Sequence, residues 1–359
     1  MGVTLGAALS ALTANAEVYW VNGVTEESGW YDANKTPSYA YGDDGYYWDD
    51  DKIKGDISTC HAAAAANLIA WWQDRYKGKK LPDGVPTDAQ EIWQTYKEHQ
   101  IRDTAGTVSY SLQWWLTGVN VPDSDDETES ARQAARTRDG HVNSVDNSFS
   151  VTNGYYYDEY LSPFATGEIE PNGSDKGLSA ELSSFFNFQS FEENAEGFAA
   201  ATAAMTTAIQ AGQGVALQLT YDGGSHHALT LWGLETNITS SDDLSIQDYL
   251  YDNVTIHKLW LTDSDDSKKQ YGGFTDPSLF YVYVRENNDT GLMTIMDHGE
   301  ANTNATSDRG LDTFTVTGIT TVDPRVSDKW FAAAMVPEPT TATLSLLGLL
   351  SLAVRRRRR

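Results

Sequence analysis

Residues 56–76 read DISTCHAAAAANLIAWWQDRY and give the strongest helix signal in the chain. Alanine has the highest helix propensity of all residues, and the segment contains a run of five alanines. Leu68, Trp71 and Trp72 recur at the three- and four-residue spacing of one helix face. We therefore expect a helix here that buries an apolar side and organises the surrounding fold.

Cys60 lies near the start of this helix and is the only cysteine of the chain, which excludes a disulfide within it. Ser58 or Thr59 can cap the helix, which places Cys60 in the first turn. The N–H groups and the dipole of a first turn stabilise a thiolate and lower the thiol pKa from about 8.5. We interpret Cys60 as a candidate nucleophile; the alternative is a small buried apolar residue.

Helices are expected mainly in the first half of the chain and strands in the second. Further helices are predicted at 88–99 and 193–211 from their apolar spacing. Alternating apolar residues predict strands at 215–221, 227–232, 259–262, 279–285 and 312–317. The short gaps between strands favour an antiparallel sheet, so the predicted class is α+β, with the cysteine-bearing helix packed against a mostly antiparallel sheet.

A thiolate nucleophile needs a base, and the sequence offers His227 for this role. His226 and His227 follow the turn-forming residues 222–225 (DGGS) and begin a predicted strand, where rigid backbone can hold an imidazole. Asp263 and Asp265 come at the end of another predicted strand, and a carboxylate there can accept the imidazole N–H. The alternative is a structural histidine beside a solvated acidic turn.

The composition excludes several classes of protein. With 11 Trp, 19 Tyr and 11 Phe in 359 residues, the chain is too aromatic for a disordered polyanion. Its 25 Lys and Arg against 51 Asp and Glu give a net charge of −26, which argues against binding to nucleic acid. No cofactor is expected, and Cys60 and the histidines lack the spacing of a zinc site. The acidic run 123–129 is interpreted as solvated surface, with a calcium loop as the alternative.

Both ends of the chain look like targeting signals. Residues 3–16 (VTLGAALSALTANA) are apolar, uncharged and end on Ala-Asn-Ala, which predicts a signal peptide over 1–16. Residues 336–359 contain a Pro-Glu-Pro sequence, an apolar stretch at 341–354 and five terminal arginines, and this order resembles the PEP-CTERM sorting tail that an exosortase processes. The resemblance implies export, transient membrane association through the tail, and a location at the cell surface or outside a Gram-negative-type bacterium.

Residues 17–335, between these ends, resemble the IdeS/Mac family of immunoglobulin-degrading cysteine endopeptidases over about 26–273. The similarity lies in four groups of residues: 29–32 (GWYD) with Lys35 and Thr36; Cys60, Ala62, Ala63, Asn67, Trp71, Trp72 and Asp74; His227 with 231–233 (LWG); and 262–265 (TDSD). Two features differ from the family pattern. His61 replaces a glycine, and the segment between Lys35 and Cys60 is longer.

The resemblance implies a papain-like fold for this region and a role for each matching residue. Cys60 would be the nucleophile, His227 the base, Asp263 the residue that orients His227, Asp265 its supporting acid, and Lys35 a residue of the oxyanion site. The expected activity is cleavage of a protein, such as an immunoglobulin or another host glycoprotein, through a thioester. Two alternatives stay open: a surface binding protein on a catalytically idle protease scaffold, and a cysteine amidase that acts on cell-wall peptide.

Overall fold

The computed structural model describes most of the region between the two predicted targeting signals. The described residues are 17–35, 48–49, 52–53, 59–99, 107–118, 154–168, 176–221, 224, 226–237, 255–265, 277–296, 311 and 314–334. The predicted signal peptide (1–16), the sorting tail (336–359) and the acidic run 123–129 lie outside them.

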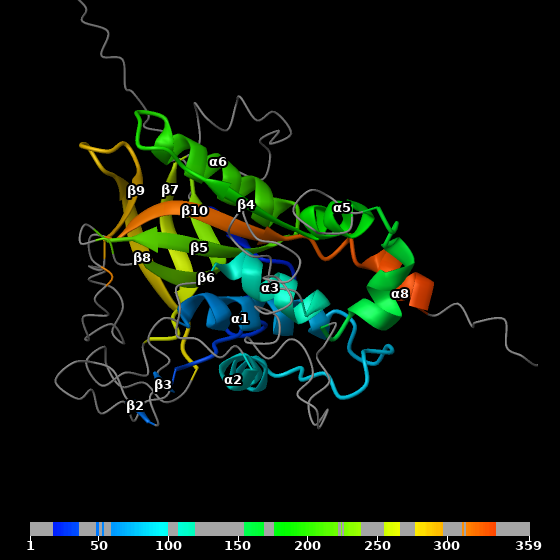
Figure 1. Ribbon diagram of the computed structural model, residues 1–359. Coiled ribbons are helices and arrows are strands. Elements are labelled where there is room, and N and C mark those ends of the chain that lie inside the picture. The colour runs from blue at the N-terminus through cyan, green and yellow to red at the C-terminus, as the bar shows by residue number, and fades with distance from the viewer. Residues whose placement is uncertain are drawn as a thin grey trace, which may run out of the picture.

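Six antiparallel strands form a closed barrel in the second half of the chain (Figure 1). They are β5 (Gly214–Thr220), β6 (His226–Thr236), β7 (Ile256–Thr262), β8 (Phe280–Glu286), β9 (Met293–Met296) and β10 (Thr315–Val322). Their order is β6-β5-β10-β9-β8-β7, and pairing of β7 with β6 closes the circle. The expected antiparallel sheet of an α+β protein is confirmed, and its closure removes most of the free edges of the sheet.

Three shorter pairings add to this core. β1 (Glu17–Trp20) extends β6 at its C-terminal half, and β4 (Phe186–Ser190) extends β10. β2 (Trp48–Asp49) and β3 (Lys52–Ile53) form a separate two-stranded sheet. Gly233 of β6 lies under the indole of Trp20, because a Cβ atom at position 233 would come within 2.6 Å of that ring. The additions β1 and β4 and the short barrel strand β9 were not predicted from the sequence.

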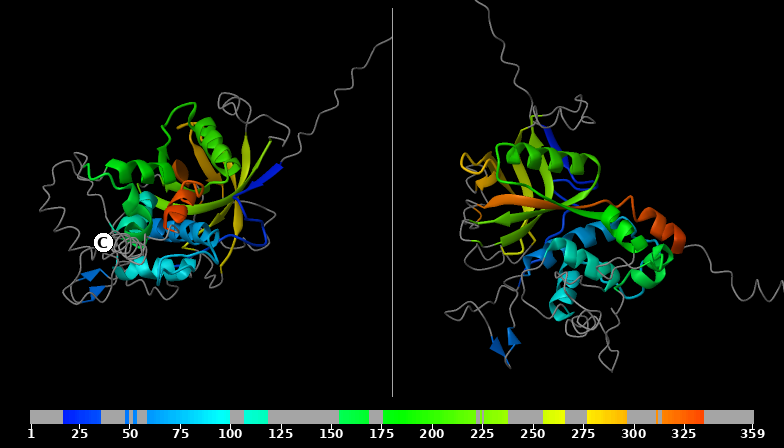
Figure 2. Two further views of the ribbon diagram at one scale, coloured as in Figure 1. Left: turned by 90° about the vertical axis from the view of Figure 1, so that its right-hand side faces the viewer. Right: turned by 45° about the horizontal axis from the view of Figure 1, so that its top comes forward.

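The helices pack on two sides of the barrel. The group α1 (Cys60–Asp74), α2 (Ala89–His99) and α3 (Val108–Thr117) lies on one side, and α6 (Gly197–Gln210) lies on the other (Figures 1 and 2). Beyond the C-terminal end of α1 lie η1 (Tyr157–Leu161), η2 (Ser162–Phe164), α5 (Lys176–Phe185) and α8 (Asp328–Ala334). The helices predicted at 56–76, 88–99 and 193–211 are confirmed as α1, α2 and α6.

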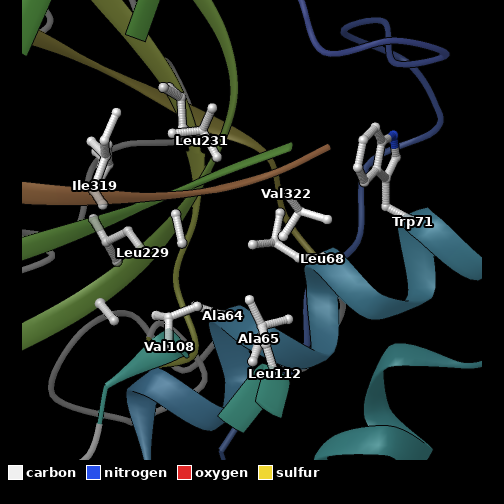
Figure 3. Packing of buried hydrophobic residues seen from close by; sticks show 14 of the residues in the cluster. Ala64, Ala65, Leu68, Trp71, Val108, Leu112, Leu229, Leu231, Ile319 and Val322 are labelled. Carbon is white, nitrogen blue, oxygen red and sulfur yellow. The ribbon is translucent and has the colours of Figure 1, made fainter. Parts of the chain in front are cut away.

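Helix α1 is buried over almost its entire length. All of its residues except Asp74 are buried, and the alanines 62–66 allow other elements to approach its axis closely. Figure 3 shows the layers in contact: Ala64, Ala65, Leu68 and Trp71 of α1, Val108 and Leu112 of α3, Leu229 and Leu231 of β6, and Ile319 and Val322 of β10. Thr59 occupies the N-cap position, but its side chain makes no capping hydrogen bond, so the predicted capping by Thr59 is wrong.

Aromatic side chains fill the space around the C-terminal half of α1. Trp72 is 1% exposed, and its indole N–H donates to Ser327 Oγ at 2.8 Å. Five rings surround its indole: Tyr76, Tyr156, Phe185, Trp330 and Phe331. Through Trp72, α1 is therefore joined to η1, α5 and α8.

Replacing Trp72 by alanine should remove this connection. We expect Trp72→Ala to lower the free energy of unfolding by about 3–5 kcal/mol, since the surrounding rings cannot collapse into the cavity. Urea denaturation followed by circular dichroism measures the change. The matched control is Phe188→Ala on β4, where the side chain is 43% exposed and a loss below about 1 kcal/mol is expected. Equal losses in the two variants would contradict this packing.

Candidate active site

The start of α1 meets the barrel where β6 and β7 pair. Cys60 is the first residue of α1, and His227 is the second residue of β6. The register pairs Thr230 with Thr262, so Asp263, which follows β7 directly, lies level with the first residues of β6. Antiparallel pairing therefore brings together a histidine and an aspartate that are 36 residues apart in the chain.

His227 connects the aspartate to the thiol. Its Nε2 atom is 2.8 Å from Asp263 Oδ1, and both side chains are buried. The imidazole also interacts with the Cys60 thiol, whose pKa it lowers. Because Nε2 is bound to the carboxylate, Nδ1 is the ring nitrogen left for that interaction. The backbone N–H of Asp265 also donates to Asp263 Oδ1, at 2.9 Å, and so fixes the carboxylate.

These contacts favour a thiolate and an imidazolium. Burial alone would raise the pKa of the Cys60 thiol, but the hydrogen bond from His227 and the positive charges of Lys35 and His227 lower it. Burial alone would lower the pKa of His227, but the charge and hydrogen bond of Asp263, together with Cys60, raise it well above its usual value. Both shifts favour transfer of the thiol proton to the imidazole.

Lys35 supplies a second cation that acts on the thiol. Its Nζ atom is 2.6 Å from Asp265 Oδ1, and its side chain is completely buried. Burial alone would lower the pKa of Lys35, but the charges of Asp265 and Cys60 raise it. Asp265 thus contacts Lys35 through its carboxylate and Asp263 through its backbone. The site thus combines two ion pairs, His227 with Asp263 and Lys35 with Asp265, and both cations act on the Cys60 thiol.

The other histidines that the structure describes have different partners. His61 is buried, and its Nδ1 atom is 2.8 Å from Ser111 Oγ of α3. His226 is exposed, and its Nδ1 atom is 3.2 Å from Thr220 Oγ1. His257 is exposed on β7. The preference for His227 over His61 and His226 agrees with this geometry.

Asn67 holds the segment that carries Lys35. From the middle of α1 its Oδ1 accepts the backbone N–H of Ala33 at 2.8 Å, and its Nδ2 donates to Thr230 Oγ1 at 3.0 Å and to Thr262 Oγ1 at 3.3 Å. Thr262 in turn donates to the carbonyl of Tyr31 at 2.9 Å. The only sequence signal for this structural role of Asn67 is that it is a single amide in an apolar helix.

Among the described residues, no His, Cys, Asp and Glu side chains form a group of three or more that could hold a metal ion. Among the same residues, no helix combines the length and the apolar character needed to cross a membrane.

Comparison of the sequence with protein-family models and with curated proteins gave no match.

The positive charge of His227 beside the Cys60 thiol should lower the pH at which the thiol reacts. Because the thiolate is the species that reacts, the rate of alkylation by iodoacetamide should reach half its maximum below about pH 8, under the ordinary range of about 8–9 for a thiol. His227→Ala removes the hydrogen bond and the positive charge that lower this pKa, so the midpoint should rise by at least about one pH unit. Intact-mass spectrometry measures the single adduct, since Cys60 is the only thiol. A wild-type midpoint above pH 8 would contradict the charge assignment.

Proposed function

We propose that the chain is a cysteine endopeptidase that hydrolyses peptide bonds through a thioester at Cys60. One observation carries the proposal: the imidazole of His227 is hydrogen-bonded to Asp263 and interacts with the thiol of Cys60, which begins a buried helix. A nucleophile, a base and a residue that orients the base are the three components that nucleophilic acyl transfer requires.

The first half of the reaction forms the acyl-enzyme. The sulfur of Cys60 attacks the carbonyl carbon of the scissile peptide, a C–S bond forms, and negative charge moves to the carbonyl oxygen. The backbone N–H of Cys60 lies in the first helical turn, where N–H groups have no partner within the helix, and it can donate to this oxyanion. The positive charge of Lys35 stabilises the same developing charge. The C–N bond then breaks as the His227 imidazolium gives its proton to the leaving amine.

The second half consumes water. Neutral His227 removes a proton from a water molecule that attacks the thioester carbonyl, and the C–S bond breaks to release the carboxylic acid product. The thiolate and the imidazolium are then restored. Asp263 keeps Nε2 of the imidazole engaged throughout, so that Nδ1 stays directed at the reacting atoms.

The finer assignment is a papain-like peptidase related to the IdeS/Mac family. A helix that starts with the nucleophile and packs against an antiparallel barrel that carries the base supports it. We propose a protein substrate, with immunoglobulins and other host glycoproteins as the first candidates. We also propose export through residues 1–16 and sorting through residues 336–359, which keep the enzyme at the cell surface or release it.

Cleavage assays on a panel of proteins test the activity. The panel contains intact immunoglobulins, unrelated glycoproteins and cell-wall fragments, and products are followed by gel and mass spectrometry. We expect cleavage of at least one protein, and a loss of kcat of about 10⁴-fold or more in Cys60→Ala. His227→Ala should lose about 10²- to 10⁴-fold, because it lacks the base.

His226→Ala is the matched control for His227→Ala. It removes the neighbouring exposed imidazole and should change the rate by less than about threefold. A Cys60→Ala protein that cleaves at the wild-type rate would remove the proposed function. If only the cell-wall fragments are cleaved, the endopeptidase proposal is wrong and the chain is an amidase that acts on cell-wall peptide.

A further inference from the structure

Lys35 belongs to a segment outside any strand that is held by the side chain of Gln90 and by the backbone carbonyl of Ser264. The peptide group between Asn34 and Lys35 is bound on both sides. Its carbonyl accepts a hydrogen bond from Gln90 Nε2 at 2.8 Å, and its N–H donates to the carbonyl of Ser264 at 2.9 Å. One contact comes from α2 and the other from the residues after β7.

Gln90 binds this segment twice. Besides donating to the Asn34 carbonyl, its Oε1 atom accepts the backbone N–H of Asn34 at 2.8 Å. The carboxamide therefore takes the place that a peptide group of an adjacent strand would occupy. Two bonds to one residue restrict both its position and the rotation of the peptide group that follows.

The backbone of Gln90 is itself fixed at the start of α2. Asp88 Oδ1 accepts the N–H of Gln90 at 2.9 Å and that of Glu91 at 3.2 Å, which is an N-terminal cap. Asn34 is only 8% exposed, while Gln90 is exposed. A substitution at Gln90 therefore changes the support of a buried segment without opening a cavity in the core.

We propose that Gln90 is a positioning residue that sets the place of the Lys35 ammonium beside Cys60. The inference rests on the proposed function only for its consequence in turnover, because the effect on the thiol exists without substrate. Loss of both hydrogen bonds frees the Asn34–Lys35 peptide group on the α2 side. Lys35 then spends less time at the distance where its charge stabilises the thiolate, so the thiol pKa rises.

The test is the pH profile of Cys60 alkylation by iodoacetamide in the full chain. Gln90→Met keeps the length of the side chain and removes both hydrogen bonds. We expect its alkylation midpoint to rise by about 0.3–0.7 pH unit, which lowers the rate below the midpoint by about two- to fivefold. Gln94→Met is the matched control, since Gln94 is exposed one turn further along α2, and its profile should equal that of wild type.

A double-mutant cycle separates positioning from a general loss of structure. In a Lys35→Met background there is no ammonium to position, so Gln90→Met should cause no further shift. Circular dichroism shows which variants are folded, and Gln90→Asn, whose carboxamide is one methylene too short, is used in the same way if Gln90→Met does not fold.

Two results would overturn the inference: an unchanged profile in a folded Gln90 variant, or the same shift with and without Lys35. Neither depends on proteolysis. Failure of the cleavage assays therefore removes the proposed function and leaves this test intact, whereas an unchanged alkylation profile removes the role of Gln90 alone.

Discussion

The burial of helix α1 is the constraint on which the rest of the structure depends. The barrel, α2, α3 and the aromatic cluster around Trp72 all pack against it, and only its ends approach the surface. Alanines at 62–66 make this possible, because larger side chains would separate the barrel from α3. Since the helix cannot shift without disturbing both layers, the sulfur atom at its first residue is held at a fixed point beside β6 and β7.

The electrostatic cost of the site is offset locally. Burial disfavours the charged forms of Cys60, His227 and Lys35, yet each of these groups lies beside a group of opposite charge. Asp263 pairs with His227 and Asp265 pairs with Lys35, and the backbone N–H of Asp265 ties the two aspartates together. Both cations, His227 and Lys35, lower the pKa of the Cys60 thiol.

Much of the helix and strand content could be predicted from local patterns. Residues 56–76 and 88–99 have clear helical spacing, and the longer barrel strands alternate well enough to be recognised. β1, β4 and β9 are short, and their strand state depends on partners far away in the chain, which a local pattern does not reveal. The closure of the barrel by β6 and β7 is equally a property of tertiary structure.

The residues of the candidate site also differ in how far the local sequence reveals them. Cys60, His227 and Asp263 carry chemical signals of their own: a lone thiol at a helix start, an imidazole at a strand start and a carboxylate at a strand end. Gln90 carries none, and Asn67 is marked only as a single amide in an apolar helix, so the support that they give appears only when Ala33 and Asn34 are seen beside them. The pairing of Asp265 with Lys35 was also beyond prediction from local sequence, because 230 residues separate them and only the fold brings them together.

The protonation state of His227 tests the central claim most directly. Nitrogen-15 NMR of the imidazole distinguishes the imidazolium from the neutral ring, and Cys60→Ala provides the comparison without a thiolate. The account predicts that His227 is doubly protonated at pH 7 in the wild-type chain. It also predicts that the pKa of His227 falls in Cys60→Ala while Asp263 keeps it above the ordinary value for a histidine. A neutral His227 at pH 7 in the wild-type protein, or a pKa that is unchanged by the loss of Cys60, would contradict it.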